Sequence, residues 1–171
     1  FISILSYLIF FVEKFNYIKI RIFSFFDDTS KNNFQSEKAS EAIIDGGFFG
    51  KGIGEGTLNS KIPEAHTDYI VSVISEEFGI IIIFLIMISF IFFAYKIFKK
   101  IQNTDDNAFK MILVGLISLL IMQAFIHIGV NLRVLPTTGM TLPYLSYGGS
   151  SIISISIISG IILNLTKRRV Y

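Results

Sequence analysis

The stretch "GIIIIFLIMISFIFFA", residues 79–94, decides the fold because it runs for sixteen residues without a charge. A second stretch, Met111–Phe125, is also uncharged. A helix that crosses the hydrocarbon core of a bilayer needs roughly 20 mostly apolar residues. Of all 171 residues 52% are hydrophobic and 16% charged, with a mean hydropathy of +0.65, whereas soluble domains carry about 25% charged residues. The sequence therefore predicts an all-α fold, a polytopic membrane helical bundle.

Apolar runs and polar segments alternate outward from this stretch. The chain opens with Phe1 inside an apolar run, so we interpret it as the C-terminal piece of a longer protein whose first span here is truncated. Residues 13–26, "EKFNYIKIRIFSFF", mix charged and apolar side chains and are expected to form an interfacial helix or strand on the membrane surface. We expect one domain with a truncated span at 1–13, an extracytoplasmic loop at 14–68, a span at 69–98, a span at 109–130, an extracytoplasmic loop at 131–147 and a span at 148–166.

Basic residues in short loops indicate the orientation of a membrane protein, because such loops stay on the cytoplasmic side. In the short cytoplasmic loop and the tail lie Lys96, Lys99, Lys100, Lys110, Lys167, Arg168 and Arg169, whereas the short outer loop has one basic residue. The seven basic residues of the long segment 14–68 do not oppose this orientation, because long loops translocate largely regardless of charge. The C-terminus is therefore expected to be cytoplasmic, and Asp68 to face the outside.

Composition also excludes several functions. A net charge of +2 without a basic stripe does not indicate nucleic acid. The absence of cysteine excludes disulfides and thiol chemistry, and two histidines alone are not typical of a zinc site.

The segment "PEAHTDYIVSVISEEFG", residues 63–79, permits two interpretations. Asp68 either caps the helix that follows, where a carboxylate suits the helix dipole, or it begins a polar stripe. Asp68, Ser72 and Ser75 or Glu76 share one helical face, and ionisable groups at membrane depth are candidates for function. A partly buried aspartate has a raised pKa, which suits a general base.

The glycine-rich stretch "GGFFGKGIGEG", residues 46–56, has no P-loop or dinucleotide-binding spacing. A turn-rich loop is favoured over an anion nest built from its backbone N–H groups.

The stretch "LPTTGMTLPYLSYGGSS", residues 135–151, is expected to form a re-entrant or tightly packed outer loop. Beside it, Arg133 could bind a phosphate, although pairing with a carboxylate is favoured. His127 lies in an apolar run with Gln123 and Asn131 one turn to either side. This pattern favours hydrogen bonding between helices over a proton relay.

These three motifs, in this order and with apolar runs between them, closely resemble the C-terminal half of the SEDS family (shape, elongation, division and sporulation proteins). The resemblance covers about residues 34–169. The residues "TLPYLSYGGSS", with Thr141 before Leu-Pro, favour the division branch over the rod-elongation branch. One position departs from the pattern, because many division members carry lysine where this chain has Thr138. That departure leaves one cation missing from the outer loop, where Arg133 remains.

The resemblance implies an inverting glycosyltransferase that polymerises lipid II into peptidoglycan at the division septum of the bacterial cytoplasmic membrane. Asp68 matches the essential carboxylate of the family's A-H-T-D motif, and its implied role is general base. The candidate substrate-binding residues are His66, Thr67, Lys51, Gly52, Glu76, Arg133, Ser146 and Ser150. No cofactor is certain, and a divalent cation, Mg²⁺ or Mn²⁺, is the one the resemblance implies. The implied partners are a class B penicillin-binding protein transpeptidase and other divisome proteins.

Two rival functions remain open. A flippase or transporter of lipid-linked precursors also places polar groups within spans, and a scaffold could recruit the transpeptidase without catalysis. The cytoplasmic side carries only Asp105 and Asp106, which favours chemistry on the outer face. This piece alone is not expected to be active.

Overall fold

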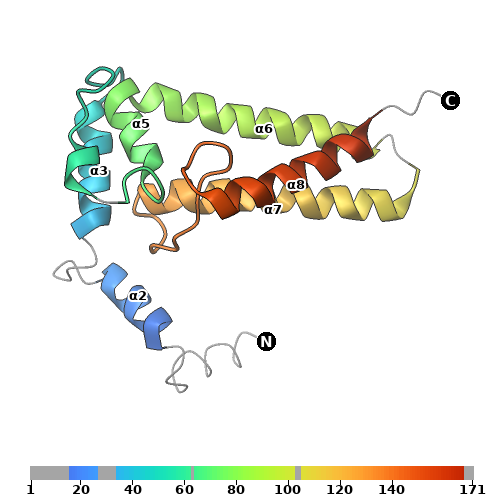
Figure 1. Cartoon of the computed structure of the whole chain (residues 1–171), viewed down its shortest axis with the longest axis horizontal. Helices are drawn as coiled ribbons and strands as arrows, with labels where there is room; N and C mark the ends of the chain where they lie inside the picture. Colours follow the sequence, from blue (N-terminus) through green and yellow to red (C-terminus); the bar gives the residue numbers. More distant parts are fainter. Residues whose placement is uncertain (1–15, 27–33, 63, 103–104, 168–171) are drawn as a thin grey trace.

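The computed structural model describes residues 16–26, 34–62, 64–102 and 105–167, and these residues form helices joined by turns and loops, without a strand. The expected truncated span at 1–13 and the tail residues Arg168 and Arg169 lie outside this part of the chain. Figure 1 shows the helices in chain order: α2 (Asn16–Phe26), α3 (Phe34–Gly46), α4 (Leu58–Lys61), α5 (Ile70–Phe78), α6 (Ile80–Gln102), α7 (Asn107–Asn131) and α8 (Gly149–Thr166).

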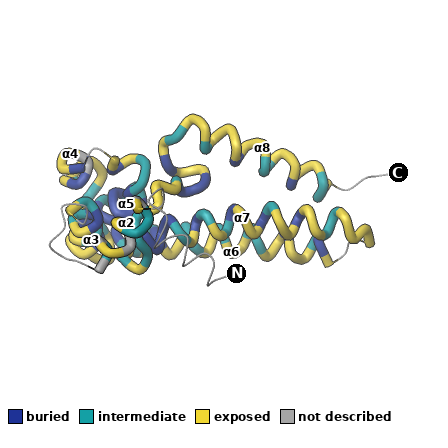
Figure 2. The backbone as a smooth tube through the Cα atoms, turned by 90° about the horizontal axis from the view of Figure 1, so that it is seen from below, coloured by how far each residue is buried: buried dark blue, intermediate teal, exposed yellow. Residues whose placement is uncertain are grey.

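Three of these helices, α6, α7 and α8, are long and apolar enough to cross a membrane. The prediction of an all-α membrane protein is confirmed. Helix α7 begins at a cap, since the carboxylate of Asp106 accepts hydrogen bonds from the backbone of Ala108 (2.8 Å) and Phe109 (3.4 Å). Large apolar side chains such as Phe84 and Ile88 stay exposed along α6, as lipid-facing side chains do. Exposed residues are frequent along all three helices (Figure 2), and α8 packs on α6 and α7 through Ile155 and Ile162.

The apolar run expected as one span at 69–98 is divided into α5 and α6. Gly79 lies between them with φ 84°, a left-handed conformation that ends a right-handed helix. The backbone N–H of Ile80 then donates to the carbonyl of Gly47 (2.9 Å). The glycine-rich loop thus packs into the junction, and the short helix α5 carries the candidate residues at the end of the bundle rather than along a span.

The segment expected as an extracytoplasmic loop, 14–68, contains the helices α2, α3 and α4. Helix α3 packs on α5 at one end of the long helices (Figure 1). Small and apolar side chains between them form a compact core of Ala39, Ala42, Leu58, Ile62, Ala65, Tyr69 and Val73. This core holds the turn that contains Asp68.

Candidate functional site

Asp68 lies in a tight turn directly before α5. The backbone N–H groups of Thr67 and Asp68 both donate to the carbonyl of Glu64 (3.1 Å each). The N-cap of α5 is Tyr69, whose side chain makes no capping hydrogen bond. Among the described residues, none donates a hydrogen bond to the Asp68 carboxylate. The helix-cap interpretation therefore loses its main support, because a capping carboxylate accepts from the backbone of the first turn.

Polar side chains of α7 hold this turn by hydrogen bonds. Nδ2 of Asn131 donates to the carbonyl of Asp68 (2.9 Å), while its Oδ1 accepts from the hydroxyl of Ser72 (2.9 Å). Nε2 of His127 lies 3.3 Å from the carbonyl of Thr67. Asn131 and His127 are both buried. The preference for interhelical hydrogen bonding over a proton relay agrees with these contacts, and Ser72 is fully buried.

The outer loop covers the same turn from the other side. The hydroxyl of Ser146 donates to the carbonyl of Thr67 (2.8 Å), and the backbone N–H of Tyr147 donates to the carbonyl of His66 (3.0 Å). A Cβ atom built on Gly139 would lie 3.8 Å from Oδ2 of Asp68. The loop is thus tightly packed around the A-H-T-D turn, and its glycine leaves room beside the carboxylate.

Burial and charge act together on Asp68. Partial burial raises the pKa of Asp68 above its ordinary value, and the nearby negative charge of Glu64 adds to this effect. The positive charge of Arg21 opposes it. A carboxylate with a raised pKa and no hydrogen bond from the described backbone has the properties of a general base.

Arg21 is a residue that the sequence did not single out. It lies on α2, and its Nη1 donates to the carbonyl of Thr137 in the outer loop (3.1 Å). The pattern of residues 13–26 indicated an interfacial element, and α2 is indeed a helix. Nothing in the sequence indicated that this helix would reach the loop beside Asp68.

Glu76 occupies a second centre, at the far end of α5, and is buried. It accepts hydrogen bonds from Nζ of Lys51 (3.0 Å) and from the backbone N–H groups of Thr57 (3.0 Å) and Leu58 (2.9 Å). The hydroxyl of Thr57 is a further donor, at 3.1 Å. Burial acts to raise the pKa of Glu76, but the hydrogen bonds outweigh it and hold the pKa below its ordinary value. The contacts make Glu76 an anchor for the loop before α4.

The glycine-rich loop serves the same end of α5. The backbone N–H groups of Lys51 and Gly52 donate to the carbonyls of Glu76 (2.9 Å) and Glu77 (3.1 Å). These carbonyls belong to the last turn of the helix, which needs such partners. Because these N–H groups bond to the carbonyls, the loop acts as a cap for the end of α5. Lys51, Gly52 and Glu76 therefore lie together at this end of the helix, away from the contacts around Asp68 at the other end.

The remaining candidates have separate positions. Arg133 follows α7 with a left-handed backbone (φ 55°), and its N–H donates to the carbonyl of Val130 (3.1 Å). Ser150 is exposed in the first turn of α8, where its carbonyl accepts from the hydroxyl of Ser154 (3.0 Å). His66 is exposed beside Asp68. Within the described residues, no three His, Asp or Glu side chains gather in a way that could hold a metal ion.

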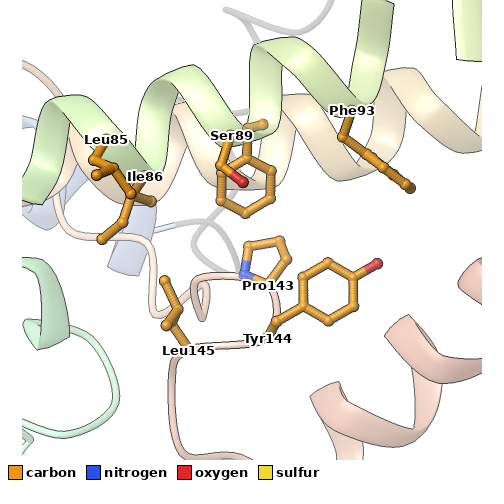
Figure 3. A pocket seen from close by; sticks show the side chains of 8 residues that line it. Leu85, Ile86, Ser89, Phe93, Pro143, Tyr144 and Leu145 are labelled. Carbon is orange, nitrogen blue, oxygen red and sulfur yellow. The ribbon is translucent and has the colours of Figure 1, made fainter. Parts of the chain in front are cut away.

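An apolar hollow adjoins the site. Its volume is about 370 Å³, and it is lined by side chains of α6 and by Pro143, Tyr144 and Leu145 of the outer loop. Figure 3 shows Pro143 and Tyr144 across from Ser89 and Phe93. The next residue after Leu145 is the serine that holds the A-H-T-D turn. The hollow therefore borders the same outer loop that holds the A-H-T-D turn.

The fold and site define a class of protein. It is a polytopic membrane protein with an aspartate at one end of its spans, in a turn that hydrogen bonds from α7 and the outer loop hold in place. The profile of the FtsW/RodA/SpoVE family, described as cell cycle proteins, matches residues 1–171. The chain belongs to this family.

Relatives of this chain support the assignment. The protein named "Probable peptidoglycan glycosyltransferase FtsW" of Caulobacter vibrioides is 37% identical over 155 residues, which cover 91% of this chain and 40% of that protein. The proteins of the same name are 36% identical in Geobacter metallireducens, over 96% of this chain and 45% of that protein, and 36% identical in Bacillus subtilis, over 73% and 31%. The chain thus spans less than half the length of these relatives.

Proposed function

We propose that the whole protein is a peptidoglycan glycosyltransferase that polymerises lipid II into glycan strands during septal wall synthesis. Family membership and the names of the relatives support the reaction class. The observation that carries the role of Asp68 is its geometry. It is a half-buried carboxylate without a hydrogen bond from the described backbone, held in a turn by Asn131 and Ser146.

The proposed step uses Asp68 as the general base. Asp68 takes the proton from the acceptor sugar hydroxyl while the hydroxyl oxygen forms a bond to the anomeric carbon of the donor. The bond from that carbon to the lipid diphosphate breaks, and its electron pair leaves on the diphosphate oxygen. Attack opposite the leaving group inverts the configuration. A positioned general base typically contributes 10²–10⁴-fold to such a step.

The site suits a lipid-anchored substrate. Asp68 lies at one end of the spanning helices, and the apolar hollow beside the outer loop suits an isoprenoid chain. A divalent cation, Mg²⁺ or Mn²⁺, is part of the proposal only as an addition. Such an ion is typically held by one or two carboxylates and by substrate phosphates, and it would neutralise diphosphate charge.

The cellular setting is proposed on the same grounds. The site faces the outside of the cytoplasmic membrane at the division septum, and the C-terminus is cytoplasmic. The proposed partner is a class B penicillin-binding protein, a transpeptidase that crosslinks the new strands, together with other divisome proteins.

Transport of the lipid-linked precursor is the rival account. A transport path needs polar groups facing a cavity along the spans. The polar side chains Gln123, His127 and Asn131 instead bond to the outer loop or to the turn at Asp68. This arrangement favours a site at the surface.

The test is lipid II polymerisation by the full-length protein with its transpeptidase partner, whose own crosslinking is blocked. Asp68→Asn and Asp68→Ala should reduce glycan synthesis by about 100-fold or more while partner binding persists. Glu55→Gln, which changes an exposed carboxylate of the glycine-rich loop, is the control and should polymerise normally. Polymerisation by both Asp68 variants near the wild-type rate would favour transport or scaffolding.

A further inference from the structure

Helix α2 has the character of a membrane-surface helix. It is 11 residues long, too short to span a bilayer, and two large apolar side chains beside Arg21 are exposed, Ile20 by 52% and Phe23 by 54%. A helix with exposed apolar side chains and an adjacent cation typically lies in the headgroup region. Arg21 would then lie at the depth where the phosphates of lipids are found.

The same arginine reaches the candidate site. Its Nη1 donates to the carbonyl of Thr137 (3.1 Å), and two residues further along the loop a Cβ atom on Gly139 would lie 3.8 Å from Oδ2 of Asp68. Arg21 and Asp68 therefore flank the same short segment of the outer loop. The side chain of Arg21 is exposed, so a ligand arriving along the membrane surface can approach it.

The chemistry of the reaction requires a cation near Asp68. The negative charge that develops on a departing diphosphate needs donors or cations aimed at it. Lys51 is engaged with Glu76 and Asp45, and the N–H groups of Lys51 and Gly52 cap α5. The guanidinium of arginine is planar and matches the spacing of phosphate oxygens with paired N–H donors.

We propose that Arg21 binds the diphosphate of the lipid-linked donor and so holds the donor's anomeric carbon within reach of the acceptor hydroxyl that Asp68 deprotonates. This inference rests on the proposed function and assigns a residue to the leaving-group side of the same site. The arginine acts as a binding residue, and the proton goes to Asp68. The positive charge of Arg21 acts to lower the pKa of Asp68, against burial and Glu64, in agreement with the position of both side chains beside the outer loop.

The test measures binding apart from turnover. The full-length protein in lipid nanodiscs is titrated with fluorescent undecaprenyl diphosphate, for wild type, Arg21→Ala, Arg21→Lys and Lys19→Ala. Arg21→Ala should weaken binding by about tenfold or more, since a hydrogen bond to a charged group contributes about 1.5–3 kcal/mol. The affinity of Arg21→Lys should lie between those of wild type and Arg21→Ala, because lysine keeps the positive charge and loses the paired N–H donors of the guanidinium. Lys19→Ala removes a half-buried cation of the same helix and should stay within about twofold, because the hydrogen bond that places a cation beside the outer loop belongs to Arg21.

Four results decide whether Arg21 binds the diphosphate. Asp68→Asn should bind the probe normally and fail to polymerise, which separates diphosphate binding from catalysis. Unchanged binding in Arg21→Ala overturns the inference, even if polymerisation falls, because Arg21 would then act by positioning Asp68. An equal loss of affinity for fluorescent phosphatidylglycerol, a lipid without a diphosphate, titrated in the same way, also overturns it and makes Arg21 a general membrane contact. If the wild-type protein binds the probe and does not polymerise lipid II, the proposed function fails and the binding result still decides Arg21.

Discussion

Helix α5 has a carboxylate at each end, and the two differ in every respect that matters for function. Asp68, just before the helix, is half-buried, accepts no hydrogen bond from the described residues and has a raised pKa. Glu76, near its end, is 1% exposed, accepts four hydrogen bonds and has a lowered pKa. A satisfied carboxylate stabilises the structure, whereas an unsatisfied one is available to a substrate.

The largest expected effect concerns the satisfied carboxylate. Glu76→Ala should lower the free energy of unfolding by roughly 3 kcal/mol or more, because the N–H groups of Thr57 and Leu58 lose their buried partner. Thermal unfolding of the full-length protein in detergent measures this loss. Glu77→Gln is the control on the same helix and should change the melting temperature little. Equal melting temperatures for Glu76→Ala and wild type would show that Glu76 does not anchor the loop before α4.

The pH dependence of stability sharpens the same contrast. Because the folded pKa of Glu76 lies below its ordinary value of 4.5, its contribution is present above that value and is lost as the pH falls through the folded pKa. Glu76→Gln should therefore be less stable than wild type at neutral pH, with the gap narrowing in acid. Melting temperatures measured from neutral to acid pH test this, and a gap that widens in acid would contradict it.

A second, somewhat smaller effect is expected in the glycine-rich loop. A Cβ atom on Gly50 would lie 2.1 Å from the carbonyl oxygen of Glu77, and its φ is 79°. Gly54 has φ 81° and open space around its Cβ position. Gly54→Ala should cost roughly 1–2 kcal/mol for the left-handed backbone alone, and Gly50→Ala clearly more. Similar melting temperatures for the two variants would show that the loop does not pack closely on α5.

The smallest effect expected is a displacement of the pH–rate profile. A general base must be deprotonated, so polymerisation should rise with pH through the pKa of Asp68. The charge of Glu64 raises that pKa and the charge of Arg21 lowers it. Glu64→Gln should therefore move the acidic limb to lower pH, and Arg21→Ala to higher pH at saturating substrate. Limbs that do not move, or that move in the opposite directions, would contradict the assignment of the base.

Much of the fold follows from the sequence because the apolar runs are long. The runs expected at 109–130 and 148–166 correspond to α7 and α8 within a few residues. The division of the run at 69–98 was not predicted, since the sequence shows an apolar stretch with one glycine. The left-handed backbone of Gly79 (φ 84°) ends the helix, and only glycine fits there, because a Cβ would lie 2.0 Å from the carbonyl oxygen of Phe48.

The site was only partly predictable. The shared helical face of Asp68 and Glu76 predicted one polar stripe, because spacing reports the face and not what packs against it. The structure divides the stripe, as Ser72 bonds to Asn131 and Glu76 to the loop before α4. Arg21 was missed because its position depends on the path of the chain between α2 and α3, which local sequence does not determine.

The most direct test of the contrast compares Asp68→Asn with Glu76→Gln in the full-length protein, with lipid II polymerisation and thermal unfolding measured on the same preparations. The account predicts that Asp68→Asn keeps the wild-type melting temperature and makes no detectable glycan. It predicts that Glu76→Gln melts at a lower temperature and still polymerises below that temperature. Polymerisation by Asp68→Asn near the wild-type rate, or complete loss of polymerisation in a Glu76→Gln protein of wild-type stability, would contradict it.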